Sequence, residues 1–190
     1  MKHIKNLKIV ITAGASGIGS KIAQILSQAD AKVVICDKDQ EVLDQFSKNN
    51  PEVITLKADV SNEEEVTSFF NEIKDHFGEI NSLINNAGIA GPSAKLEDTN
   101  FDDWKNTLSV NLNGTFLCTK SAIPLLRSAG GGSIINIGST SSFMGTPLRS
   151  SYSATKWGLI GLTKTWAMEY GVDNIRINTI CPSSVNGERI

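Results

Sequence analysis

Short apolar runs alternate with helical segments along this chain, and this alternation restricts its fold more than any other feature. Six short runs, most of them rich in Ile and Val, are bounded by turn residues, as in strands that are buried on both faces. They are KIVIT (8–12), KVVIC (32–36), VITLK (53–57), SLINN (82–86), SIINI (133–137) and IRINTI (175–180). Helical spacing and start signals between them, such as Ser61 followed by Glu64, predict helices over residues 18–28, 40–49, 61–77, 101–128 and 151–170.

Strands that alternate with helices form an α/β structure, a parallel sheet covered by helices on both faces. Right-handed crossovers leave few arrangements, and the doubly wound Rossmann fold with strand order 3-2-1-4-5-6 fits best. The chain has 190 residues, of which 40% are hydrophobic, and this suits one domain over residues 1–190 with one sizeable core. Ligands of such sheets bind outside the carboxyl ends of the strands, so the residues that follow each strand are the functional candidates.

The turn after the first strand is rich in glycine and reads Thr-Ala-Gly-Ala-Ser-Gly-Ile-Gly over residues 12–19. Glycine lets the backbone turn tightly and approach a pyrophosphate, and the start of the following helix adds partial positive charge. A turn of this kind between a strand and a helix predicts a dinucleotide site. Its candidate residues are Thr12, Gly14, Ser16, Gly17, Ile18 and Gly19.

Acidic residues follow the second and third strands. Asp37 comes roughly 20 residues after the glycine turn, the distance at which a carboxylate accepts hydrogen bonds from the ribose hydroxyls of NAD. Because this carboxylate would repel a 2′-phosphate, NAD is favoured over NADP, although the adjacent Lys38 weakens the preference. The alternative role for Asp37 is to cap the next helix. Asp59, followed by Val60, either bonds the adenine edge or only starts the next loop.

Asparagines stand near the end of the fourth strand and in the helix that follows it. Asn86 could tie its loop to neighbouring segments, and the next residues, Ala87 and Gly88, permit close approach of a cofactor. Asn111 lies in the helical stretch LSVNLNGTF, where Asn and Gly are unfavourable. We therefore expect a local irregularity in this helix, of the kind that often serves a site.

Tyr152 and Lys156 are four residues apart in a predicted helix, so both side chains stand on one helical face. A phenol has a pKa of about 10 in water, and a nearby cation favours its ionised form. The pair can therefore act as an acid–base group; a surface tyrosine beside a surface lysine is the alternative. Ser139 follows the fifth strand, where a hydroxyl could hold and polarise a substrate oxygen.

With these residues in this order, the sequence resembles the short-chain dehydrogenase/reductase family in its compact form. The resemblance covers the whole chain and rests on TAGASGIG, NNAG, Asn111, Ser139 and YSATK. It implies hydride exchange between a nicotinamide cofactor and a secondary alcohol or ketone. It also implies that Tyr152 transfers the proton and that Lys156 bonds the nicotinamide ribose. In the same scheme Ser139 holds the substrate oxygen, and Asn111 supports a proton relay through water.

Parts of the cofactor site depart from the family's pattern. Ala13 stands where the family usually has the first glycine of its turn. After the sixth strand, Pro182 is followed by Ser183 where the family has glycine, and position 187 is Gly in place of Thr. Val185 still suits a contact with the nicotinamide, so we expect Pro182, Ser183 and Val185 to line its site.

The chain stops at Ile190, where family members continue through a substrate-covering segment, a further helix and a final strand. The resemblance therefore implies a domain that is incomplete at its C-terminus. Two other functions stay open. One is an NADPH-dependent ketoreductase of the 3-oxoacyl-carrier-protein type, which Asp37 disfavours. The other is a nucleotide-binding protein without turnover, which Ser183 and the early end of the chain favour.

Composition argues against other classes of protein. A formal net charge of -2 without a dense Lys/Arg block argues against a nucleic-acid surface. Cys36, Cys118 and Cys181 are widely spaced and form no metal-binding pattern, which favours a reduced, cytoplasmic setting and no metal. No stretch suits a signal peptide or a membrane span. We expect a small-molecule substrate and, from the resemblance, a homodimer or homotetramer.

Overall fold

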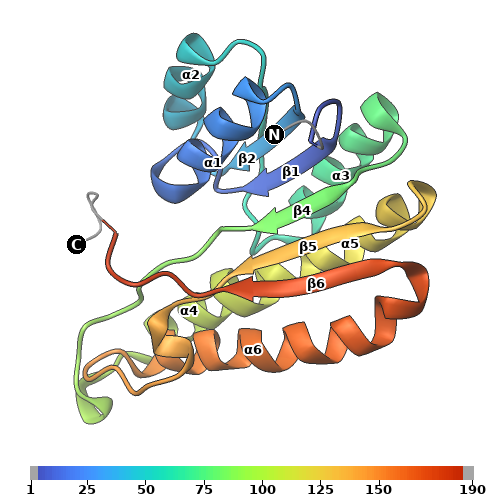
Figure 1. Cartoon of the computed structure of the whole chain (residues 1–190). Helices are drawn as coiled ribbons and strands as arrows, with labels where there is room; N and C mark the ends of the chain where they lie inside the picture. Colours follow the sequence, from blue (N-terminus) through green and yellow to red (C-terminus); the bar gives the residue numbers. More distant parts are fainter. Residues whose placement is uncertain (1–3, 186–190) are drawn as a thin grey trace.

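Six strands form one parallel sheet in the computed structural model, which describes residues 4–185. The strands are β1 (Lys8–Thr12), β2 (Lys32–Asp37), β3 (Ile54–Lys57), β4 (Ser82–Asn85), β5 (Gly132–Ile137) and β6 (Ile175–Ile180). Their order is β3-β2-β1-β4-β5-β6, and every pairing is parallel. The predicted doubly wound fold and strand order are confirmed. All arrowheads in Figure 1 point to the same edge of the sheet, where the candidate residues follow.

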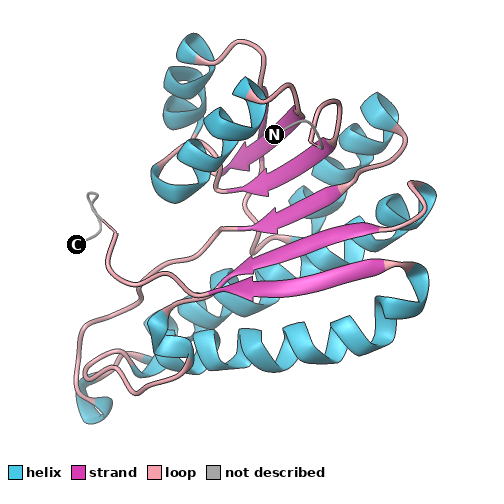
Figure 2. Cartoon of the chain, viewed as in Figure 1, coloured by secondary structure: helices cyan, strands magenta, loops and turns pink. Residues whose placement is uncertain are grey.

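Helices cover both faces of this sheet, as Figures 1 and 2 show. The α-helices are α1 (Gly17–Gln28), α2 (Gln40–Asn49), α3 (Glu63–Phe77), α4 (Phe101–Leu108), α5 (Gly114–Ser128) and α6 (Ser150–Tyr170). Short 3-10 turns are η1 (Leu96–Asp98), η3 (Thr140–Ser142) and η4 (Gly171–Asp173), and η2 (Ser109–Asn113) is a π turn between α4 and α5. None of the helices within residues 4–185 is both long and apolar enough to cross a membrane.

The alternation of side chains along each strand explains why the strand sequences are apolar throughout. Successive residues of a strand point to opposite faces of the sheet. Ile9 and Ile11 of β1 belong to a buried cluster with Leu43 of α2, whereas Val10 belongs to a second cluster with Phe69 of α3. Side chains on both faces of the central strands are therefore buried. For this reason nearly every residue of these strands is apolar, mostly Ile or Val.

The start of α3 differs from the prediction. The helix is capped by Asn62, whose side-chain oxygen accepts hydrogen bonds from the backbone N–H groups of Glu64 (3.0 Å) and Glu65 (3.2 Å). Ser61 lies outside the helix, and its hydroxyl donates to Asp59 Oδ1 at 2.7 Å. The predicted cap at Ser61 was wrong because this hydroxyl is already engaged and the next residue provides a better-placed oxygen.

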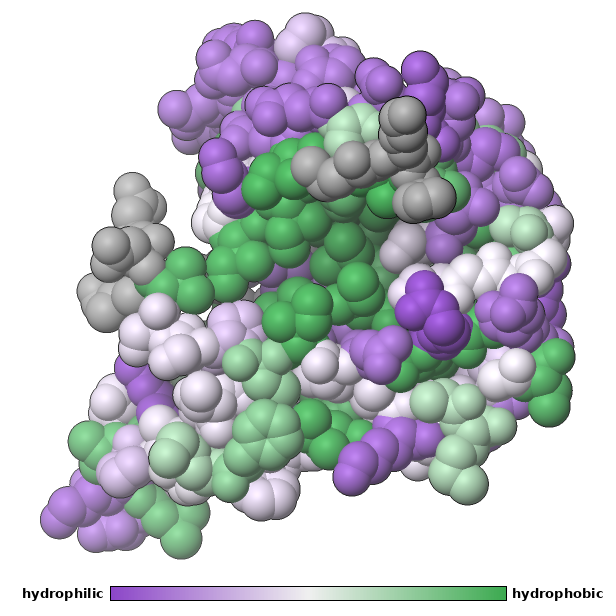
Figure 3. Space-filling view, viewed as in Figure 1, coloured by the Kyte–Doolittle hydropathy of each residue, from purple (hydrophilic) through white to green (hydrophobic). Residues whose placement is uncertain are grey.

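One face of the sheet is covered only over part of its width. Helices α1 and α2 pack against β1 to β3. Within the described residues, no helix lies over β5 and β6 on that side (Figure 1). The space-filling view in Figure 3 shows an apolar area in this region. Ile135 is partly buried there, and Ile180, at the end of β6, is 52% exposed. The apolar surface thus reaches the edge at which the candidate site lies.

Candidate active site

The glycine turn after β1 is fastened to the loop after β4 by four hydrogen bonds. Thr12 Oγ1 accepts from the backbone N–H groups of Asn86 and Ala87, each at 3.0 Å. The Asn86 amide donates to the carbonyl oxygens of Thr12 (3.1 Å) and Ala13 (2.9 Å). Thr12 itself is only 1% exposed. Two segments more than 70 residues apart are therefore held as one unit at the edge of the sheet.

The glycines of the turn serve different purposes. Gly17 has φ +53° and open space where a Cβ would stand. A Cβ on Gly19 would overlap the Ala13 carbonyl, and one on Gly14 would lie 2.5 Å from the Ile35 side chain. No side chain of the described residues caps the start of α1, and its first turn holds no acidic residue. An uncapped helix start beside an open glycine fits a phosphate group.

Ala13 occupies the position at which the sequence departs from the family's pattern, and its φ is +48°. This left-handed conformation suits glycine better than alanine, so the methyl group adds strain to the turn. The turn nevertheless keeps its bonds to Asn86. Ser16 precedes the helix in an extended conformation, and Ile18 lies half-buried in its first turn.

The two acidic candidates lie at neighbouring strand ends. Asp37 is the last residue of β2, and within residues 4–185 its carboxylate accepts one long hydrogen bond of 3.4 Å, from the N–H of Asp39. Asp39, rather than Asp37, caps α2 through bonds of 3.0 and 3.3 Å to backbone N–H groups, so the capping alternative for Asp37 was wrong. Asp59 Oδ1 accepts from the N–H (2.9 Å) and hydroxyl (2.7 Å) of Ser61, so it does shape the next loop.

Asn111 lies in the π turn η2, which confirms the expected irregularity of this helix. The side chain is 1% exposed. Its oxygen accepts from the N–H of Ile89 (2.8 Å), and its amide donates to the Ile89 carbonyl and to Thr155 Oγ1, each at 3.0 Å. Val60 packs closely against Gly114, the residue that follows the π turn. A Cβ on Gly114 would lie 2.7 Å from Val60 Cγ2. Asn111 thus joins the loop after β4 to helix α6.

Tyr152 and Lys156 lie one turn apart near the start of α6, as their spacing predicts. Lys156 Nζ is 5.5 Å from the centroid of the Tyr152 ring and donates to the Ile137 carbonyl at 2.7 Å. The lysine is only 5% exposed, so the alternative of a surface pair was wrong. A Cβ on Gly88 would lie 3.6 Å from this Nζ, which brings the loop after β4 to the same place. The Lys156 amine is therefore buried beside the Tyr152 ring.

Ser139 directly precedes the short turn η3, against which α6 packs. Its hydroxyl accepts from the N–H of Ser141 at 3.1 Å. Within the described residues no hydrogen bond joins this hydroxyl to Tyr152, although both lie on segments at the same edge. The next residue, Thr140, donates its N–H to the Pro182 carbonyl at 3.1 Å, which ties the loop after β5 to the segment after β6.

The segment after β6 is largely exposed. Ser183 and Val185 follow Pro182 there, and Val185 is 46% exposed. Position 187, where the sequence has Gly in place of Thr, lies outside the described residues. The described part of this segment reaches the candidate site through the Pro182 carbonyl and through Cys181, whose Sγ would lie 2.8 Å from a Cβ on Gly138.

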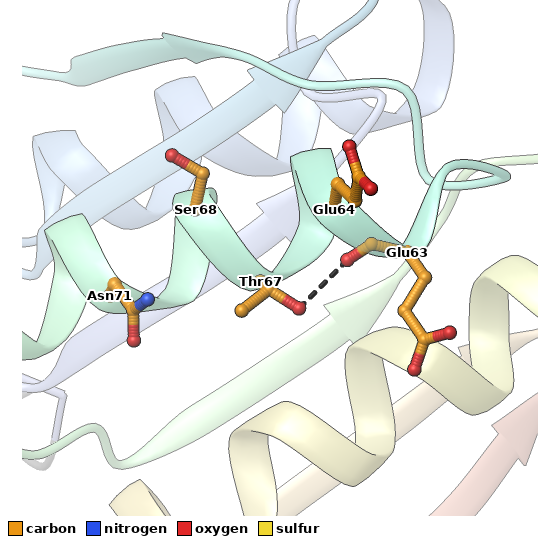
Figure 4. A pocket seen from close by; sticks show the side chains of 5 residues that line it. All are labelled: Glu63, Glu64, Thr67, Ser68 and Asn71. Carbon is orange, nitrogen blue, oxygen red and sulfur yellow. Dashed lines mark hydrogen bonds between the residues drawn. The ribbon is translucent and has the colours of Figure 1, made fainter.

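A surface cavity of about 490 Å³ lies away from these residues, on helix α3. Figure 4 shows its lining side chains on the outer side of the helix, where Thr67 donates to the Glu63 carbonyl at 2.8 Å. None of the predicted site residues contributes to it. Residues 4–185 also contain no group of three or more His, Cys, Asp or Glu side chains that could hold a metal ion.

Sequence reasoning missed two partners within this site. Thr155 accepts the Asn111 amide, and the Ile137 carbonyl accepts the Lys156 ammonium. Thr155 could have been suspected, because it is the only hydroxyl residue directly beside Lys156 in YSATK. The Ile137 carbonyl left no signal in the sequence, since every residue carries one.

Known proteins are similar to this chain in sequence and in fold. The sequence profile described as short chain dehydrogenase matches residues 7–189. The uncharacterized oxidoreductase YxbG of Bacillus subtilis is 39% identical, over 97% of this chain and 69% of that protein. The trans-4-hydroxycyclohexanecarboxylate dehydrogenase of Sinomonas cyclohexanicum is also 39% identical, over 94% of this chain and 72% of that protein. The crystal structure of an NAD+-bound xylitol dehydrogenase superposes with a TM-score of 0.94 at 27% identity, covering 98% of this chain and 73% of that one. The chain therefore belongs to the short-chain dehydrogenases, a family of oxidoreductases.

Proposed function

We propose that this protein transfers a hydride between NAD(H) and a secondary alcohol or ketone. The observation that carries the proposal is the buried Lys156 ammonium beside the Tyr152 ring, at the edge where the glycine turn also lies. A bound nicotinamide would supply the hydride chemistry. The chain itself has to bind the substrate oxygen, move its proton and hold the two reactants in place.

Tyr152 is the proposed acid–base group. In alcohol oxidation its phenolate oxygen removes the proton of the substrate hydroxyl, and in ketone reduction the phenol returns it. The proposed role of Lys156 is to stabilise negative charge on the phenolic oxygen while the proton moves, since its Nζ lies 5.5 Å from the centroid of the Tyr152 ring and opposite charges attract. The bond from Lys156 to the Ile137 carbonyl keeps the ammonium at this place.

Ser139 and Asn111 have supporting roles in this scheme. The Ser139 hydroxyl bonds the substrate oxygen and polarises it as charge develops. Asn111 uses its side-chain oxygen and both amide hydrogens on protein groups. It therefore supports the proposed water relay by fixing the loop and the helix that surround it, with its side chain fully engaged.

The cofactor is held, in this proposal, by the glycine turn with Gly17 and Gly19, by the loop of Asn86, Ala87 and Gly88, and by Asp37 and the segment after β6. Asp37 supports NAD over NADP, because its carboxylate would repel a 2′-phosphate and accepts a single long hydrogen bond, of 3.4 Å, among the residues that the structure describes. The NAD+-bound xylitol dehydrogenase is similar to this chain over 98% of this chain and 73% of its own, which agrees with that preference. The relative named trans-4-hydroxycyclohexanecarboxylate dehydrogenase acts, by its name, on a hydroxy compound. This supports an alcohol carbon as the reacting centre of the proposed reaction.

Two measurements test the proposal. In calorimetric titrations with NADH and NADPH side by side, we expect tighter binding of NADH, and Asp37→Asn should reduce the difference. Tighter binding of NADPH would instead favour the ketoreductase alternative. With NAD and either xylitol or trans-4-hydroxycyclohexanecarboxylate, Tyr152→Phe should lower kcat by about 100-fold or more while NADH binding changes little. Equal turnover by wild type and Tyr152→Phe would refute the role of the phenol.

A further inference from the structure

Thr155 lies between the two proposed reacting residues of α6 and is completely buried. Its hydroxyl donates to the Tyr152 carbonyl at 2.7 Å and accepts from the Asn111 amide at 3.0 Å. Asn111 is 1% exposed and Tyr152 is half-buried. Water therefore cannot easily replace the two hydrogen bonds of the Thr155 hydroxyl. The family resemblance assigned Thr155 no role.

These bonds extend into a continuous path across the site. The Asn111 side chain makes two hydrogen bonds to the backbone of Ile89, in the loop after β4. Its amide donates a third hydrogen bond to the Thr155 hydroxyl. Thr155 then bonds the backbone of the turn that carries Tyr152. On the other side of the same turn, Lys156 is held by the Ile137 carbonyl of β5. The first turn of α6 is thus fixed from two directions, by Thr155 towards the π turn and by Lys156 towards the sheet.

We propose that Thr155 is a positioning residue, which sets the place of Tyr152 by linking its backbone to Asn111. The inference rests on the proposed function, because it assigns Thr155 an effect on the acid–base step. The Thr155 hydroxyl touches neither substrate nor cofactor in this role. Its loss would leave an amide hydrogen of Asn111 unpaired and let the start of α6 shift relative to the loop that carries Gly88.

A second buried threonine on the same helix provides the matched comparison. Thr163 is 7% exposed, and its hydroxyl accepts from the Asn136 amide at 2.8 Å. It too pairs with a buried asparagine amide, but this asparagine lies in β5 and Thr163 is two turns further along α6. If Thr155 were merely a satisfied core hydroxyl, removal of either hydroxyl would affect turnover equally.

The experiment compares Thr155→Val, Thr155→Ser and Thr163→Val with the wild type, all as the full chain. Steady-state kinetics with NAD and xylitol or trans-4-hydroxycyclohexanecarboxylate give kcat and KM, and thermal unfolding gives stability. We expect Thr155→Val to lower kcat by about 10- to 100-fold with less than about a threefold change in the KM for NAD. Thr155→Ser should stay within about threefold of wild type, because it keeps the hydroxyl. Thr163→Val should lose a comparable amount of stability but keep kcat within about twofold.

The outcomes separate this inference from the proposed function. A wild-type chain without turnover on either alcohol refutes the proposed function and the inference with it. An active wild type in which Thr155→Val and Thr163→Val have the same kcat refutes the inference alone. A Thr155→Ser variant as slow as Thr155→Val would also refute it, since the hydroxyl would then be irrelevant. If the valine variants do not fold, the corresponding alanine variants make the same comparison.

Discussion

Replacing Thr12 by valine should loosen the site and destabilise the whole fold. The substitution keeps the shape of the side chain but removes the oxygen that accepts from the N–H groups of Asn86 and Ala87. An unpaired buried N–H costs about 1–3 kcal/mol. Because Asn86 and Ala87 are only half-buried, we expect a combined loss at the lower end, about 2–4 kcal/mol in the free energy of unfolding. For a chain of this size that corresponds to roughly 4–16 °C in Tm.

Urea unfolding of Thr12→Val and Thr12→Ser measures this effect directly. The serine variant keeps the accepting oxygen and loses one methyl group, which costs about 1 kcal/mol. Thr67→Val is the control for an exposed hydroxyl with a bond of similar length, 2.8 Å to the Glu63 carbonyl. It should change stability by less than about 0.5 kcal/mol, because water replaces the bond. If Thr12→Val were no less stable than Thr12→Ser, the argument that this oxygen holds the two segments together would fail. The valine variant should also bind NADH more weakly.

Three further perturbations have expected results. Asn62→Ala should cost about 1 kcal/mol in urea unfolding and Ser61→Ala less, and the reverse order would contradict the observed cap of α3. Gly91→Ala should cost about 2 kcal/mol or more, because φ is +67° and the new Cβ would lie 2.6 Å from a buried threonine oxygen; an unchanged unfolding midpoint would argue against this conformation. Burial raises the pKa of the Cys36 thiol from 9.0 to about 12, so the folded chain holds this proton more tightly than the unfolded chain. The resulting stability is present below pH 9 and is lost between about pH 9 and 12, and Cys36→Ala should flatten the measured fall in this window.

The positions of most elements could be read from the sequence, because burial on both faces of a parallel strand leaves an unbroken apolar run. The π turn at Asn111 was predictable as an irregularity from the poor helix formers around it, although its type was not. The start of α3 was not predicted, since Ser61 and Asn62 are both good caps and only the bond from Ser61 to Asp59 decides between them. Local competition of this kind is invisible in a sequence pattern.

The sequence by itself determined the alternation of strands and helices, the glycine turn, and the one-turn spacing of Tyr152 and Lys156. These features depend on neighbours along the chain, whose geometry is fixed by the helix and strand repeats. Only the tertiary structure decided that Lys156 is buried against the Ile137 carbonyl, and that Asn111 reaches Thr155. These contacts join residues 19 and 44 positions apart. They exist because parallel strands bring distant loops to one edge, which no local pattern of residues encodes.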